Sequence, residues 1–221
     1  MRLLDLSNKN IGEESMWILK KFFCAVCLGI ILIPIVGCST MPKVKRVDVA
    51  DVIDISGRWN DTDARVVAEN IISDASASLW NENFRDVQGR KPVIIVGNVI
   101  NRSHEQIDTL VVVKAFEHAL LNSNGMTFVA SRDERTGIRQ ERSDQNTEGM
   151  TRPDTITPIG QETGADFMLI GTINSVVDEY GPRSVVFYQV NMEIVDLTTN
   201  EKVWFGQANV KKTVDKKKHV L

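Results

Sequence analysis

The sequence has few cysteines, and its larger C-terminal part has none. Cys24, Cys27 and Cys38 all precede residue 40. A disulfide framework, a cysteine-based zinc site and a catalytic thiol are therefore excluded from the rest of the chain. Cys24 and Cys27 form a CxxC spacing, but they sit in an apolar run without a βαβ context, so we interpret them as apolar filler and not as a redox pair.

Histidine is also scarce, and the familiar catalytic and nucleotide-binding motifs are missing. His104 and His118 are too far apart for a helical metal-binding motif, and His219 lies in a basic tail, so each is interpreted as a helix-surface or tail residue. No GxSxG, P-loop or GxGxxG pattern occurs. Carboxylates are plentiful, but helix capping or solvent exposure explains each better than catalysis. We expect no catalytic residue, no metal, no cofactor and no small-molecule substrate, and hence a protein that is not an enzyme.

An excess of basic residues is missing as well. Lysine and arginine number 26 against 29 aspartates and glutamates, which gives a formal charge of −3, and aromatic residues make up only 6%. Without a basic stripe interleaved with aromatics, nucleic acid is set aside as a partner. The remaining composition, 43% hydrophobic and 25% charged, is typical of one globular domain with additional sequence at an end.

The longest apolar run lies near the N-terminus. Lys20-Lys21 precede the uncharged stretch 22–33, and Ile35-Val36-Gly37-Cys38 follows. A basic region, a short apolar region and a small residue before a cleavage point are typical of a secretory signal, so residues 1–37 are expected to be removed. An uncleaved membrane helix is the alternative, and the abrupt polar switch after Cys38 disfavours it.

The start of the chain suggests a different initiator. Residues 2–15 carry acidic side chains and no periodicity, unlike the basic region of a signal peptide. The segment from Met16 to Lys21 fits that region far better. We therefore predict that Met16 is the true initiator.

The Gly37-Cys38 ending resembles the lipobox of bacterial lipoproteins. This resemblance implies that Cys38 is joined to a diacylglycerol and becomes the first residue of the mature chain. Residues 38–55 then form the lipidated cysteine and a short tether, 56–214 the globular domain, and 215–221 a basic tail. The tether spans at most about 58 Å when extended and roughly 23 Å as a coil.

Hydrophobic periodicity and turn residues predict the elements of the globular domain. The mixture of helices, a βαβ-like first half and a later run of antiparallel strands predicts a single α/β domain. It would hold a mixed sheet of about five strands with flanking helices. We expect four helices: one at about 62–84, one from a capping box at Ser103 to residue 122, one that starts at a capping box at Ser131, and one from Thr157-Pro158 to Gly164. We expect strands at 93–97, 126–130 and 167–173, and two more between Val185 and Phe205.

Two short stretches are candidates for contact with a partner protein. Tyr180 and Arg183 flank Gly181-Pro182 at an expected hairpin tip, and tyrosine and arginine are enriched in binding hot spots. A plain solvated turn is the alternative. Arg58-Trp59 is the second candidate, although packing of Trp59 against the core is favoured over a role as an interaction anchor.

Several blocks in the same order resemble one known family. The LpoB family of penicillin-binding protein activators shares the words SGRWNDTD (56–63), GNVINRS (97–103), EQIDT (105–109), GADFMLIG (164–171) and KVWFG (202–206). GADFMLIG alone is weak, because similar words occur in the amino-terminal domain of TolB and in curli-type secretion lipoproteins. The first two blocks are more specific.

The resemblance implies a non-catalytic lipoprotein on the periplasmic face of the outer membrane. It would bind a bifunctional class A penicillin-binding protein and stimulate peptidoglycan synthesis. The short tether departs from the long linker of familiar members, which leaves the inner membrane or a different envelope partner open. A curli-type secretion subunit and a hydrolase are the alternatives; the first needs spare lipid-facing strands that the sequence after the signal does not supply.

Overall fold

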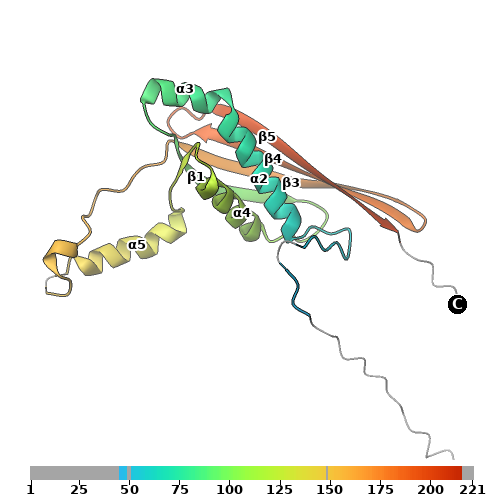
Figure 1. The fold of residues 1–221 in the computed structure, drawn as a ribbon, viewed down its shortest axis with the longest axis horizontal. Helices are drawn as coiled ribbons and strands as arrows, with labels where there is room; N and C mark the ends of the chain where they lie inside the picture. Colours follow the sequence, from blue (N-terminus) through green and yellow to red (C-terminus); the bar gives the residue numbers. More distant parts are fainter. Residues whose placement is uncertain (1–44, 49–50, 148, 216–221) are drawn as a thin grey trace, which may run out of the picture. The chain divides into compact units, whose positions relative to one another are not determined.

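The computed structural model describes residues 45–48, 51–147 and 149–215, and its helices and strands all lie in the unit Val49–Leu221 (Figure 1). The predicted signal peptide (1–37), Cys38 and the predicted tail after Asp215 lie outside the described residues. In chain order the elements are α2 (Asp61–Ala77), α3 (Leu79–Gln88), β1 (Val93–Arg102), α4 (Thr109–Asn122), β2 (Thr127–Phe128), α5 (Arg132–Gln145), the 3₁₀ turn η1 (Pro153–Thr155), β3 (Phe167–Tyr180), β4 (Arg183–Asp196) and β5 (Lys202–Asp215).

The strands form one five-stranded mixed sheet in the order β2-β1-β3-β4-β5, which confirms the predicted fold class. β1 pairs in parallel with β2 and with β3, whereas β3, β4 and β5 form an antiparallel meander. Each of these last three strands is 14 residues long. The meander is therefore the longest continuous part of the sheet.

Helix α2 begins where the sequence predicts but ends early. Asn60 caps it, accepting from the Asp63 amide in a capping box, and Ala64, Ala68, Ile71 and Ala75 form its buried stripe. The single helix expected over 62–84 is wrong, because Ser78 is extended (φ −81°, ψ 150°) and separates α2 from α3. The Ser78 hydroxyl donates to the Asp74 carbonyl, a local bond that competes with helix continuation.

The predicted helix start at Ser103 is also wrong. β1 continues to Arg102, opposite Asn174 of β3, and the Ser103 hydroxyl donates to the side chain of Asn101 at 2.7 Å. α4 starts at Thr109, where the Asp108 carboxylate accepts from the Leu110 amide. Because β1 remains paired with β3 up to Arg102, the helix starts six residues later than the capping pattern at Ser103 predicted.

After β2, one of the two helices predicted from the sequence is present and the other is not. The Ser131 capping box is present, and α5 lies on the surface with no buried residue, as predicted. The expected helix from Thr157 to Gly164 is absent. The Thr157 amide donates to Gln145 and its carbonyl accepts from Asn146, so this residue is held against the end of α5 and does not cap a new helix.

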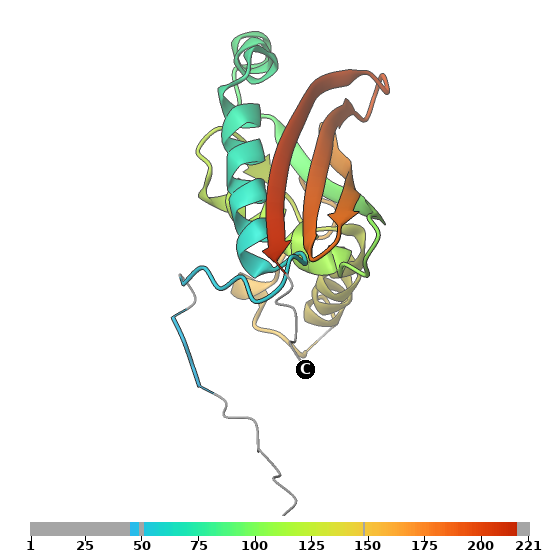
Figure 2. The ribbon, with the colours of Figure 1, turned by 90° about the vertical axis from the view of Figure 1, so that its right-hand side faces the viewer.

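The core lies between one face of the sheet and the two helices α2 and α4 (Figure 1). Figure 2 shows α2 running beside the edge strand β5. Trp80 and Phe84 pack edge-on against Phe167 at 5.3 and 5.2 Å between ring centroids, closing the core near α3. Within the described ranges, no helix has the length and apolarity needed to cross a bilayer.

Candidate functional site: the hairpin end of the sheet

The β3–β4 hairpin carries the first sequence-predicted contact residues. Tyr180 and Arg183 are paired across a two-residue turn. Gly181 has φ +58°, and Pro182 fixes its own φ near −65°, the pattern of a type II′ turn. The Tyr180 side chain is 90% exposed. A rigid turn therefore presents an aromatic ring to solvent at little cost in conformational entropy.

Arg183 is tied to the neighbouring strand and stays exposed. Its Nε donates to Oδ1 of Asp215 at 3.0 Å, and the two side chains are 81% and 73% exposed. An ion pair of this exposure contributes little to folding. The guanidinium is thus oriented by Asp215 but retains donors for a partner.

Residues 54–60, just before α2, pack on the helix-covered face of these strands, opposite the face that carries Tyr180 and Arg183. We call them the lead-in segment. Gly57 lies so close to β5 that an added Cβ would stand 2.4 Å from Val214 and 3.5 Å from Val186. Only glycine allows the backbone to approach at this position. This contact explains the glycine in the GRWNDTD block.

Lys212 of β5 holds the lead-in segment in place. Its Nζ lies 2.6 Å from Asp63 Oδ2, 2.8 Å from Asp54 Oδ1 and 3.0 Å from the carbonyl oxygen of Arg58. Three acceptors thus match the three ammonium donors, while the lysine side chain is only 9% exposed. Burial lowers the pKa of Lys212, but the bonds and charges of Asp54 and Asp63 outweigh it and raise that pKa overall.

A second cluster joins the lead-in segment to the loop after β1. The fully buried Tyr188 places its hydroxyl between the Glu105 carboxylate and the Gly57 carbonyl oxygen, the latter at 3.1 Å. Glu105 also accepts from the Trp59 amide at 3.1 Å. Burial, and then the bond and charge of Glu105, raise the pKa of Tyr188 above its usual range. The hydroxyl therefore stays protonated and serves as a structural donor.

The structure separates the four predicted contact residues into two groups. Tyr180, Arg183 and Arg58 are exposed at the same end of the sheet. The Arg58 carbonyl accepts from Lys212 of β5, and Asp215, three residues further along that strand, pairs with Arg183. Trp59 instead turns inward, its ring edge-on to Tyr188 at 5.5 Å. Of the two roles considered for Trp59, the structure thus shows packing against the core.

Three residues of this site were not singled out from the sequence: Glu105, Tyr188 and Lys212. Each lies far along the chain from its partner, so no local pattern could identify that partner. His104, expected on a helix surface, is in the loop after β1, where it stacks on Tyr188 at 6.1 Å and its Nδ1 lies 2.7 Å from the Ser175 hydroxyl. The position of Lys212 among alternating apolar residues was the one available signal.

The exposed part of this region forms a mixed surface, which we call the hairpin end: 176–187 of the β3–β4 hairpin with 211–215 of β5. Val176, on the same face as Tyr180 and Arg183, is 64% exposed, and Val177, on the other face, is 38% exposed. Exposed apolar side chains bordered by charges are typical of protein-binding surfaces. The hairpin end therefore offers exposed apolar and charged side chains for contact with a partner.

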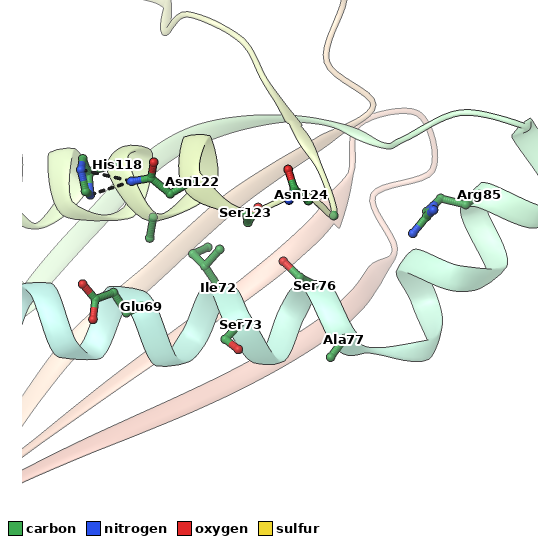
Figure 3. Close-up of a pocket in the computed structure, with 12 residues that line it drawn as sticks. Glu69, Ile72, Ser73, Ser76, Ala77, Arg85, His118, Asn122, Ser123 and Asn124 are labelled. Atoms are coloured by element: carbon green, nitrogen blue, oxygen red, sulfur yellow. Dashed lines mark hydrogen bonds between the residues drawn. The ribbon is translucent and has the colours of Figure 1, made fainter.

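An open pocket lies elsewhere, between the C-terminal halves of α2 and α4 (Figure 3). Glu69, Ser73, Arg85 and His118 contribute to its lining, and none of the sequence-predicted site residues does. Asn122 Nδ2 contacts His118, at 3.2 Å from Nε2. In the part of the chain that the structure describes, no three His, Cys, Asp or Glu residues gather as metal ligands.

The described part of the chain is thus a single α/β domain with a five-stranded mixed sheet and an exposed hairpin. The family model of the peptidoglycan-synthase activator LpoB matches residues 63–210, well over half of the sequence. The chain belongs to this family of cell-envelope lipoproteins, which activate a synthase and are not themselves catalysts.

Solved structures and curated proteins were also compared. The LpoB C-terminal domains of Salmonella enterica and Escherichia coli each share 16% identity over 67% of this chain and 98% of theirs, with a TM-score of 0.38. The lipoprotein GNA1162 of Neisseria meningitidis shares 17% identity over 55% of this chain and 83% of its own, with a TM-score of 0.37. None of the curated proteins matches significantly.

Proposed function

We propose that this protein binds a bifunctional class A penicillin-binding protein through the hairpin end and stimulates its peptidoglycan synthesis without catalysis of its own. The observation that carries the proposal is the pairing of Tyr180, 90% exposed, with Arg183 on a conformationally fixed turn. Membership of the synthase-activator family supports the choice of partner. Tyr180 and Arg183 supply the anchors, and Arg58 borders them.

The proposal includes membrane attachment through lipidated Cys38. The lipobox-like sequence supports it, because a single acyl chain holds a protein only marginally and Cys38 is the one plausible site for several chains. We assign the lipoprotein to the periplasmic face of the outer membrane. The shortness of residues 39–55 makes the inner membrane the alternative location.

The partner proposal is tested by retention of a synthase on the immobilised full chain from detergent-solubilised membranes. A class A penicillin-binding protein, identified with a fluorescent penicillin, should be retained and should polymerise lipid-linked precursor faster in the presence of the chain. The double variant Tyr180→Ser, Arg183→Ala should lose both effects. The matched control is Lys202→Ala, an exposed charge at the opposite end of β5. Equal retention by the double variant would place the contact elsewhere.

The anchoring proposal is tested by Cys38→Ser and fractionation. The variant should accumulate as an uncleaved or soluble precursor, whereas the parent chain should be recovered from membranes and should incorporate labelled palmitate. A variant that is processed normally and remains in membranes would exclude Cys38 as the anchor. Density separation of the two membranes would decide between the outer and inner locations.

A further inference from the structure

The face of the sheet that points away from α2 and α4 is open to solvent. Side chains alternate along β4, so Val190, Met192 and Ile194 are buried under the helices while their neighbours point the other way and are half-buried. On β5 the outward residues from Phe205 to Thr213 are exposed. Figure 1 shows α2 and α4 together on one side of the strands.

The centre of this open face is a block of neutral polar side chains. We call it the amide patch: Thr172, Asn174, Gln189, Asn191, Gln207 and Asn209. Register places Thr172, Asn191 and Gln207 in one cross-strand row. Asn174, Gln189 and Asn209 form the adjacent row. Five of the six members are amides from three neighbouring strands, all on one face.

The hydrogen-bonding capacity of the amide patch is largely unused. Asn174 donates to Thr172 at 3.3 Å, and Gln207 donates to Asn209 at 3.0 Å. The two central side chains, Gln189 and Asn191, make no side-chain hydrogen bond within the described part of the chain. Each amide offers two N–H donors and a carbonyl acceptor, so the patch holds a two-dimensional array of free donors and acceptors.

Strand formation does not explain this choice of residues. Asparagine is depleted in strands, where β-branched and aromatic residues are favoured, yet three asparagines occupy adjacent outward positions of the sheet. A solvated face would tolerate the charged residues that are common on protein surfaces. The block instead excludes charge, and Glu193, next along β4, is already paired with Lys202 at 2.8 Å.

Aromatic rings stand at both ends of the amide patch. Phe187 precedes Gln189 on the same face of β4, and Phe205 precedes Gln207 on β5 with 57% of its surface exposed. From the row of Phe187 to the row of Phe205 the strands run six residues, about 20 Å. The six neutral positions of the amide patch thus lie between two exposed or half-exposed rings, with Lys211 beside Phe187 and Glu193 beside Phe205.

The chemistry of this platform fits a sugar polymer better than a protein. Hydroxyl and acetamido groups are neutral, paired donors and acceptors that match amide side chains, and the apolar C–H faces of sugar rings pack on aromatic rings. Protein interfaces are instead anchored by tryptophan, tyrosine and arginine, which the amide patch lacks. The six positions themselves hold no cation; Arg102, opposite Asn174, and Lys211, two residues after Asn209, border them on the same face.

We infer that the amide patch binds the glycan strand of peptidoglycan, an N-acetylated polysaccharide, along the sheet. The choice of this polysaccharide rests on the proposed function. The six positions of the amide patch adjoin the hairpin end, which contains Phe187, but share no residue with it. The domain would then hold the product strand on the open face of the sheet while the neighbouring hairpin end contacts the enzyme that makes it.

Binding is tested with the full chain purified in detergent and two probes. The first is protein-free peptidoglycan sacculi, used in co-sedimentation. The second is soluble glycan strands whose stem peptides have been removed by an amidase, used in calorimetric titration. Both probes should bind. The double variant Gln189→Ala, Asn191→Ala should bind the strands about tenfold more weakly, since two hydrogen-bonding groups contribute about 1 kcal/mol or less each.

Three further variants separate the explanations. Gln207→Ala with Asn209→Ala on the edge strand should weaken strand binding with the melting temperature unchanged, which keeps the test valid if the central variant folds poorly. Phe205→Ala should also weaken it. Arg183→Ala should leave strand binding intact while affecting the synthase, so failure of the partner proposal and failure of this one are distinguishable.

Three results would overturn the inference. The first is no binding of the parent chain to strands lacking stem peptides. The second is equal binding to dextran, which has no acetamido groups. The third is a loss of synthase binding, with glycan binding retained, in the amide-patch variants, which would make the patch a protein surface.

Discussion

Lys212 Nζ lies 2.6 Å from Asp63 Oδ2, and both side chains are 9% exposed. This ion pair joins the last strand of the sheet to the first turn of α2, because Asp63 also accepts from the Asn60 amide at 2.9 Å in the capping box. One carboxylate thus serves the helix cap and the strand at once. The lead-in segment is held at the point where these two elements meet.

Replacement of Lys212 tests this arrangement. Lys212→Met leaves Asp63 without its buried cation, and we expect the free energy of unfolding to fall by about 3 kcal/mol, measured by urea denaturation. Lys211→Met is the matched control: Lys211 is the next residue, exposed on the opposite face, and its loss should change stability by about 0.5 kcal/mol or less. Equal effects in the two variants would contradict a structural role for Lys212.

Arg183→Ala should separate binding from folding. Because Arg183 and its partner Asp215 are both largely exposed, the melting temperature should stay nearly unchanged. Affinity for the class A synthase should fall by roughly 1–3 kcal/mol, measured by surface plasmon resonance. Unaltered affinity and activation would mean that the hairpin tip is only a turn.

Trp204→Ala should have the opposite effect. Trp204 is 8% exposed, and its ring fills the space where a Cβ on Gly206 would stand, 2.1 Å away. Truncation should lower the free energy of unfolding by about 3–5 kcal/mol. Phe205→Ala, one residue later and 57% exposed on the other face, is the control and should be far less destabilising in the same thermal and chemical melts.

The attachment of α5 should depend on acid pH. A hydrogen bond from Arg139 lowers the pKa of Glu162 from 4.5 to about 2. The charges of Arg139 and Arg142 act in the same direction, and burial opposes this shift with an effect smaller than that of the bond. A bond from Lys114 and two from Ser131 lower the pKa of Glu134 to about 2. Both pKa values are depressed on folding, so the stabilisation is present above pH 4.5 and is lost as pH falls towards 2.

Hydrogen exchange along α5 measures this effect. Corrected for intrinsic rates, α5 amides should lose protection between pH 4.5 and 2, while the β3–β5 meander keeps it. Glu162→Gln should show reduced protection of α5 already at pH 7. Glu141→Gln is the control: it removes an exposed carboxylate that, among the described residues, is bonded only to Gln145, and it should behave like the parent chain. A pH-independent α5 would contradict the assigned ion pairs.

The sequence predicted those elements whose signals are local. The Gly181-Pro182 turn and the alternation along β4 indicated the antiparallel meander, because a strand with one buried face must alternate. The stripe of Ala64, Ala68 and Ile71 likewise indicated α2. In each case the residues that carry the signal are the residues that make the element.

Elements that depend on distant pairing were mispredicted. Ser103 to Gln106 has the residue types of a helix start, but the pairing of Arg102 with Asn174 extends β1 into that region. The site shows the same limit, since Lys212 and Asp54 are 158 residues apart and Tyr188 and Glu105 are 83 apart. Tyr180 and Arg183 were identified because their exposure follows from a local turn.

The attachment of the lead-in segment has a mechanical consequence. The chain that comes from Cys38 enters the domain at residues 54–60, directly beside the strands that form the hairpin end. If the domain were held by a membrane at one side and an enzyme at the other, tension would pass through Lys212 and its acceptors Asp54 and Asp63, bypassing most of the sheet. A pull from the tether would load the contact between Asp54 and Lys212 first, because Asp54 is the first of these acceptors along the chain.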